Sequence, residues 1–162
     1  MKLLLDTHAI LWFTQDSPEM PEALKAQIES ANCTTFVSIA SIWEIAIKVS
    51  LGKLQLSAPI DTFVPALFQR NGFRLLPIQI EHTLKVATLP YHHKDPFDRI
   101  LIAQSLVEAT QIASADVLFD SYGVDRHWWR CARDPASGHR NRPLQRCDRH
   151  PRWSGVVRQF KT

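Results

Sequence analysis

The segment Leu3-Leu4-Leu5-Asp6-Thr7, near the start of the chain, carries the clearest signal of secondary structure in the sequence. Three consecutive leucines are typical of a strand that is buried on both faces, as the strands of a parallel sheet are. Asp6 and Thr7 follow these leucines at once, and a helical stretch at 9–13 comes next. An apolar strand that leads directly into a helix predicts the first unit of an open α/β sheet.

The same alternation continues along the chain. We predict further strands at 34–37, 73–77 and 111–115, and helices at 21–28, 39–51, 60–71, 81–88, 96–109 and 117–122. Asp95 followed by Pro96 is a strong helix start, because aspartate is a good N-cap and proline suits the first helical position. Strands that alternate with helices predict an α/β fold, a three-layer α/β/α sandwich around a short, mainly parallel central sheet.

The composition changes after residue 125. Residues 1–125 carry 9 Lys or Arg and 14 Asp or Glu, whereas residues 126–162 carry 10 and 2, so the second segment supplies the whole net charge of +3. This second segment has few aliphatic residues, and such a composition cannot bury a core. We therefore predict a domain at 1–125 and a poorly ordered basic extension at 126–162. The extension is an RNA-contacting arm, a disordered tail or an out-of-frame read-through, and we favour either of the last two.

Several classes of protein are disfavoured by the sequence. No stretch approaches the ~20 apolar residues that span a bilayer, and Asp6 interrupts the N-terminal apolar run too early for a signal peptide. We therefore expect a cytoplasmic protein without membrane contact. The three cysteines have no CxxC spacing, which argues against a disulfide framework.

Four acids from distant parts of the sequence are expected at one edge of the sheet. Asp6 and Asp116 each follow a predicted strand. Asp98 lies in the first turn of the helix that begins at 96, and Glu44 lies in the helix after the second strand. Ligands of open α/β sheets bind beyond the carboxyl ends of the strands. Clustered carboxylates repel one another, and Mg²⁺ or Mn²⁺, which prefers oxygen ligands, relieves that repulsion. The acids thus predict a site at which metal-activated water hydrolyses phosphodiesters.

Each acid also has a purely structural interpretation. Asp6 and Asp116 could cap the helices that follow them, and Asp98 could interact with the positive end of its helix. Glu44 precedes Lys48 by four residues, a spacing that favours an ion pair. The structural interpretation is weakest for Glu44, because its neighbours are apolar and a buried carboxylate needs a strong partner. The case for a site rests on the shared placement of the four.

The motifs that contain these acids resemble those of VapC-type toxins of the PIN-domain family. They are MKLLLDTH at 1–8, SIASIWEIAIK at 38–48, DPFDRILIAQ at 95–104 and SAD at 114–116, followed by Phe119 and YGV at 122–124. The resemblance runs in family order over residues 1–124. It implies a PIN-like fold and an Mg²⁺- or Mn²⁺-dependent endoribonuclease, the toxin of a toxin–antitoxin pair, usually a homodimer that a VapB-type antitoxin holds inactive. It also implies that Asp6, Glu44, Asp98 and Asp116 are the catalytic and metal-binding residues.

Further residues near these motifs are weaker candidates. Thr7 occupies a position where a hydroxyl commonly assists the site in the resembled family, and Asp95 and Asp120 are second-tier acids. Lys94 and Arg99 could contact RNA phosphates, although we favour solvated loop positions for both. His92 and His93 are expected in a polar loop.

Two other functions compete with the nuclease. A phosphatase with an aspartyl nucleophile would need a second aspartate two residues after the first, where this chain has His8. A PIN-like RNA-binding or antitoxin-binding module without turnover is the stronger alternative, against which the four intact acids argue. An antitoxin would fill a groove near the acids. Trp12, Phe13 and Trp43 are candidate groove residues, although we favour core packing for each.

Overall fold

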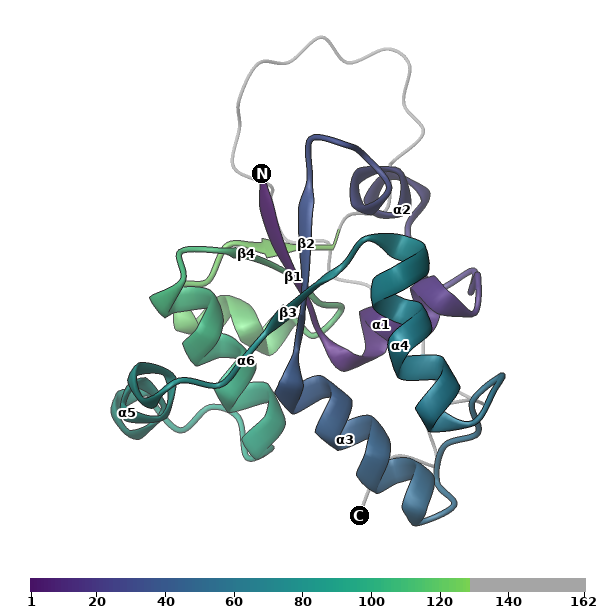
Figure 1. Cartoon of the computed structure of the whole chain (residues 1–162). Helices are drawn as coiled ribbons and strands as arrows, with labels where there is room; N and C mark the ends of the chain where they lie inside the picture. Colours follow the sequence, from purple (N-terminus) through teal and green to yellow (C-terminus); the bar gives the residue numbers. More distant parts are fainter. Residues whose placement is uncertain (129–162) are drawn as a thin grey trace, which may run out of the picture. The chain divides into compact units, whose positions relative to one another are not determined.

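Five parallel strands form the central sheet in this computed structural model, which describes residues 1–128 of the chain. They are β1 (Lys2–Leu5), β2 (Thr34–Ser38), β3 (Arg74–Leu76), β4 (Gln111–Ala113) and β5 (Arg126–His127). Their order across the sheet is β3-β2-β1-β4-β5, and every neighbouring pair is parallel (Figure 1). The predicted α/β fold with a parallel sheet is confirmed.

β1 lies at the centre of the sheet because its leucines have apolar neighbours on both faces. Leu3, Leu4 and Leu5 are all 0% exposed. Leu3 and Leu5 belong to the apolar cluster on one face, and Leu4 belongs to the cluster on the other. Side chains alternate between the two faces along a strand, so one short strand contributes to both cores.

Helices cover both faces of this sheet (Figure 1). The cluster that contains Leu3 takes side chains from α1 (Thr7–Thr14), α2 (Glu22–Ile28) and α4 (Ile60–Asn71). The cluster that contains Leu4 takes side chains from α6 (Pro96–Val107) and the 3₁₀ helix η1 (Val117–Tyr122), and α5 (Ile80–Thr88) packs against it. The structure therefore has the three predicted layers.

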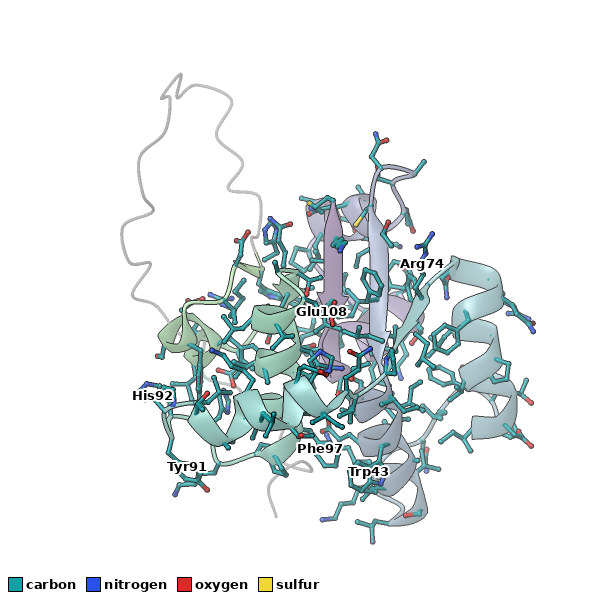
Figure 2. The ribbon with its side chains drawn as sticks, turned by 60° about the vertical axis from the view of Figure 1, so that its left-hand side comes forward. Trp43, Arg74, Tyr91, His92, Phe97 and Glu108 are labelled. Atoms are coloured by element: carbon teal, nitrogen blue, oxygen red, sulfur yellow. The ribbon has the colours of Figure 1, made fainter. Side chains whose placement is uncertain are left out.

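α3 (Ile39–Ser50) continues directly from the end of β2 and contacts both α1 and α6. Trp43 of α3 packs edge-on against Phe97 of α6, with ring centroids 5.4 Å apart (Figure 2). Glu44, the next residue of α3, is buried. α3 thereby brings one acid from the middle of the chain to the carboxyl end of the sheet.

The helix ends follow the sequence signals. Asp6, Asp95 and Asp116 are the N-caps of α1, α6 and η1, and each side chain accepts a hydrogen bond from a main-chain N–H of its helix. Gly72 and Gly123 end α4 and η1 with positive φ angles. Several details differ from the prediction. η1 is a 3₁₀ helix, β4 ends at Ala113, α6 ends at Val107, and β3 is shorter than the predicted 73–77.

β5 was not predicted, and it lies beyond the boundary that we placed at residue 125. Arg126 and His127 pair in parallel with Ile112 and Ala113 of β4. The pairing uses main-chain groups, so a short edge strand needs no apolar alternation that a sequence pattern could reveal. The described chain continues to Trp128, whose ring packs 5.3 Å from that of Trp12. The remainder of the predicted extension lies outside the described residues.

Within residues 1–128, none of the helices combines the length and the apolar composition that crossing a bilayer requires.

Candidate active site

Asp6 and Asp116 follow adjacent strands at the carboxyl edge of the sheet. β1 and β4 pair in register, Leu5 beside Ala113, so the two strands end at the same level. From β1 the chain builds β2 and β3 on one side, whereas β4 and β5 lie on the other. This reversal of strand order is the topological switch point, the usual place for ligands in an open α/β sheet.

Glu44 and Thr7 meet beside Asp6. The Thr7 hydroxyl donates a hydrogen bond of 2.6 Å to Glu44 Oε2. Lys48 pairs with the other oxygen of Glu44, Oε1, as the spacing of four residues predicted. Both carboxylate oxygens of Glu44 therefore have partners within the protein, which is the structural interpretation of this acid, and its role at a metal site stays a prediction.

Asp6 is a buried acid with several partners. Its Oδ1 accepts a hydrogen bond of 2.6 Å from the Ala9 N–H. Burial raises the pKa of the Asp6 carboxyl, and the negative charge of Glu44 adds to the rise, whereas His8 and a hydrogen bond from Ser114 oppose it. The cap explains how Asp6 is oriented, but burial and the neighbouring charge show that its ionised form lacks full compensation.

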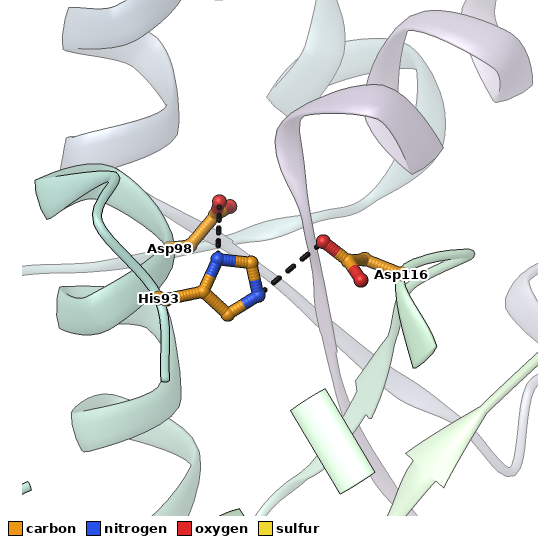
Figure 3. Close-up of side chains that lie close together, drawn as sticks. All are labelled: His93, Asp98 and Asp116. Atoms are coloured by element: carbon orange, nitrogen blue, oxygen red, sulfur yellow. Dashed lines mark ion pairs between the residues drawn. The ribbon is translucent and has the colours of Figure 1, made fainter. Parts of the chain in front are cut away.

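Asp98 and Asp116 lie on either side of the His93 ring (Figure 3). Nδ1 of His93 is 3.3 Å from Asp98 Oδ2, and Nε2 is 3.3 Å from Asp116 Oδ2. One ligand atom from each of the three residues lies within 4.8 Å of the others. The first turn of α6, the start of η1 and the loop before α6 thus converge on one point.

Burial and the neighbouring acids both act on Asp98. Burial first, and then the negative charges of Asp95, Asp6, Glu44 and Asp116, raise the pKa of Asp98 to about 8. A cation held among these carboxylates would cancel that repulsion. The donor set is mainly carboxylate oxygen, which is the chemistry that Mg²⁺ and Mn²⁺ prefer. The residues present therefore fit a hard divalent cation.

The profile of the PIN domain matches residues 3–124 of the chain, which is most of its length. The chain belongs to the PIN-domain family. The sequence resemblance to this family is thereby confirmed, and the four acids lie within the matched residues. PIN domains are nucleases in general, so the family makes a nuclease site the natural interpretation of these acids.

Solved structures of toxin–antitoxin complexes share this PIN fold. VapBC2 of Rickettsia felis, bound to a DNA fragment from its promoter, aligns with a TM-score of 0.60 at 11% identity, over 78% of this chain and 98% of that chain. VapBC-1 of nontypeable Haemophilus influenzae aligns with a TM-score of 0.56 at 15% identity, over 78% of this chain and 97% of that chain. FitAcB of Neisseria gonorrhoeae aligns with a TM-score of 0.55 at 18% identity, over 76% of this chain and 95% of that chain. At such identities the likeness shows the fold alone. The comparison with curated proteins found no match.

Neither of the second-tier acids belongs to the three-residue group of this PIN domain, although the charge of Asp95 acts on Asp98. Asp95 is exposed and accepts a hydrogen bond of 2.8 Å from the Phe97 N–H, so helix capping accounts for it as expected. Asp120 forms a two-pronged ion pair with Arg126 of β5, at 2.6 and 2.9 Å. Asp120 therefore ties the last strand to η1.

Arg99 has a structural role instead of the predicted one. Its side chain is buried, and its guanidinium donates to the main-chain carbonyls of Val86, Leu89 and Pro90 at the end of α5. The prediction of a solvated loop position is wrong, because Arg99 is buried and lies in α6. Its contact with RNA stays a prediction. Lys94 is exposed, and its contact with RNA stays a prediction.

His93 is the site residue that the sequence analysis missed. Of the two adjacent histidines only His92 is exposed, so the polar-loop interpretation is wrong for His93. A loop has no periodicity from which to tell an inward side chain from an outward one. The available signal was the position of His93 just before the Asp95-Pro96 helix start that carries Asp98.

The three aromatic residues predicted to line a groove differ in their exposure. Trp12 and Phe13 are partly buried and pack against the core cluster, as we favoured. Trp43 is 60% exposed, so core packing is the wrong interpretation for it (Figure 2). Trp43 precedes Glu44, and its contact Phe97 precedes Asp98, so an exposed aromatic surface lies next to two of the acids in the chain.

Proposed function

We propose that this PIN domain is a divalent-metal-dependent endoribonuclease and the toxin component of a toxin–antitoxin pair. The observation that carries the proposal is the convergence of Asp98 and Asp116 on His93 at the switch point, with one possible ligand atom from each of the three within 4.8 Å of the others. Burial and the charges of neighbouring acids raise the pKa of Asp98 to about 8, which a bound cation would offset. Membership in a family of nucleases supports the same reaction class.

Asp6, Asp98 and Asp116 would hold the cation, with Glu44 beside them. When bound, Mg²⁺ or Mn²⁺ supplies a Lewis acid and an activated water for cleavage of an RNA phosphodiester. Thr7 and Lys48 fix the two oxygens of Glu44, so Glu44 holds its place and has a compensating charge of its own. The negative charge left for the cation to neutralise therefore comes mainly from the three aspartates.

The partners belong to the proposal as well. The solved neighbours are complexes of the VapBC and FitAB type, and we extend a VapB-type antitoxin, a homodimer and a cytoplasmic location to this chain. Trp43, which is exposed and packs on Phe97, is the residue at which we test a protein partner. We expect the antitoxin to copurify with the parent chain but not with Trp43→Ala. The Trp43→Ala chain on its own should still cleave RNA.

RNA cleavage by the purified chain tests the catalytic proposal. We expect cleavage in Mg²⁺ or Mn²⁺, its loss in EDTA and its loss in Asp6→Asn. Asp16→Asn is the matched control, because Asp16 is an exposed acid that pairs with Lys25 just beyond α1. Undiminished cleavage by Asp6→Asn would contradict the metal site. RNA binding without cleavage in any metal would favour the module without turnover.

A further inference from the structure

His93 lies beneath two of the proposed metal-binding acids, and we propose that it positions Asp98 and Asp116 for the divalent cation. The inference rests on the proposed function, since it concerns the same site. It assigns a role to a residue outside the four acids. That role is to hold carboxylates in place, and it involves no contact with the metal.

The His93 ring is fixed by its surroundings. Its main-chain N–H donates a hydrogen bond of 2.6 Å to the buried Tyr122 hydroxyl. The ring meets Phe119 edge-on, with centroids 5.3 Å apart, and stacks on Tyr122 at 6.1 Å. Both aromatic residues belong to η1 and to the apolar cluster on that face of the sheet. Because these neighbours leave the imidazole a single orientation, the core defines where its two nitrogens point.

Each ring nitrogen faces a different acid (Figure 3). The contacts of Nδ1 with Asp98 and of Nε2 with Asp116 are both 3.3 Å long, and they are ion pairs when the imidazole is protonated. Nε2 makes no hydrogen bond, so its contact with Asp116 is one of charge and proximity. Asp116 is also held at its other oxygen, Oδ1, by the Leu118 N–H at 2.9 Å. A carboxylate has about four acceptor positions on its two oxygens. Two contacts therefore orient Asp116 and still leave lone pairs for a cation.

The exposure of the three side chains indicates which of them a cation would contact first. The side chain of His93 is 8% exposed, whereas those of Asp98 and Asp116 are 32% and 42% exposed. Nε2 has no surface open to solvent. A cation that arrives from solvent thus meets the carboxylate oxygens before the imidazole. Partners that hold metal ligands in this way commonly change metal affinity by about 10- to 100-fold when they are removed.

Mn²⁺ titration by calorimetry, on the full chain without RNA, tests the role of His93. We expect His93→Ala to weaken Mn²⁺ binding by about 10- to 100-fold. His93→Asn, which keeps one amide donor, should recover part of the affinity. His92→Ala is the matched control and should bind as the parent does, because His92 is the exposed neighbour. Thermal melting of each variant checks the fold. If His93→Ala does not fold, the Mn²⁺ affinities of His93→Asn and Tyr122→Phe test the positioning role in its place, and both should be weaker than that of the parent.

Two results would overturn the positioning role while leaving the proposed function intact. One is unchanged Mn²⁺ affinity in folded His93→Ala. The other is a nitrogen coupling to bound Mn²⁺ in pulsed paramagnetic resonance that is present in the parent and absent in His93→Ala, because it would make His93 a ligand. Failure of the parent chain to bind Mn²⁺ would overturn the proposed function together with this inference.

Discussion

Single residues in this site differ in how their charge is compensated. Glu44 has Thr7 at one oxygen and Lys48 at the other. Asp6 accepts a hydrogen bond from the Ala9 N–H, and Asp116 accepts one from the Leu118 N–H. Asp98 has the His93 contact and four negative neighbours, and its pKa rises to about 8. The negative charge of Asp98 is therefore costly in the free protein. A bound cation would remove the repulsion that makes it costly.

The raised pKa of Asp98 predicts a pH-dependent stability in EDTA. The carboxyl keeps its proton up to about pH 8 when folded, but loses it above its usual value of 3.8 when unfolded. The folded chain therefore binds more protons in this window, and the free energy of unfolding falls as the pH rises from about 4 to about 8. Asp98→Asn should fall less steeply, as urea unfolding midpoints at several pH values would show. Equal slopes in parent and variant would contradict the assignment to Asp98.

Thr7 is predicted to support Glu44 through its hydroxyl alone. Thr7→Val keeps the shape but leaves a buried carboxylate oxygen without its donor, at a cost of about 1 to 3 kcal/mol in the free energy of unfolding. Metal-dependent cleavage should fall as well. Thr7→Ser keeps the hydroxyl and should remain close to the parent in both measurements. A Thr7→Ser loss as large as that of Thr7→Val would point to the methyl group instead.

Helix termini deliver the acids to one place. α1 and η1 begin with Asp6 and Asp116, and α6 begins with Asp95 and carries Asp98 in its first turn. The amino ends of helices carry partial positive charge, which stabilises carboxylates within the first turn. The same residues thus serve as caps and as candidate ligands, so neither interpretation excludes the other.

Arg99 is predicted to join two helices. Its guanidinium holds carbonyls at the end of α5 from within α6, so Arg99→Ala should lower the free energy of unfolding by about 1.5 to 3 kcal/mol. Arg99→Lys keeps the charge but not the fork of donors and should not rescue it. The exposed Lys94 is the control, since Lys94→Ala should leave stability unchanged. A rise in the KM for RNA in Arg99→Lys without loss of stability would point to Arg99 as a phosphate contact instead.

The molecule within residues 1–128 is held by two apolar cores that share one sheet. Leu4→Ala opens a cavity in the core that contains α6, and should lower the free energy of unfolding by about 2 to 5 kcal/mol. Leu75→Ala makes the same change on β3 at a side chain that is 48% exposed, and should cost less than about 0.5 kcal/mol. Urea unfolding followed by circular dichroism compares the two. Similar losses would mean that Leu4 is not enclosed as described.

From the sequence alone, the layers of this protein and the placement of four acids at one edge of its sheet could be predicted. Buried runs such as Leu3-Leu4-Leu5, caps such as Asp95-Pro96 and stops such as Gly72 are local signals, because each depends on the preferences of a few adjacent residues. Asp6, Asp98 and Asp116 could be placed at one edge since the ends of parallel strands, and the helices that follow them, share that edge.

The partners of each side chain depend on the tertiary structure and could not be predicted from the sequence. The inward turn of His93, the carbonyl contacts of Arg99 and the edge strand β5 all depend on contacts between residues distant in the chain. The exposure of Trp43 likewise depends on what packs against α3. The contact between Thr7 and Glu44, 37 residues apart, is of the same kind. Such contacts leave no periodic trace in the sequence, because burial in a loop or at a sheet edge is set by what packs against it. Sequence thus placed the acids at the switch point, and packing decided what holds them.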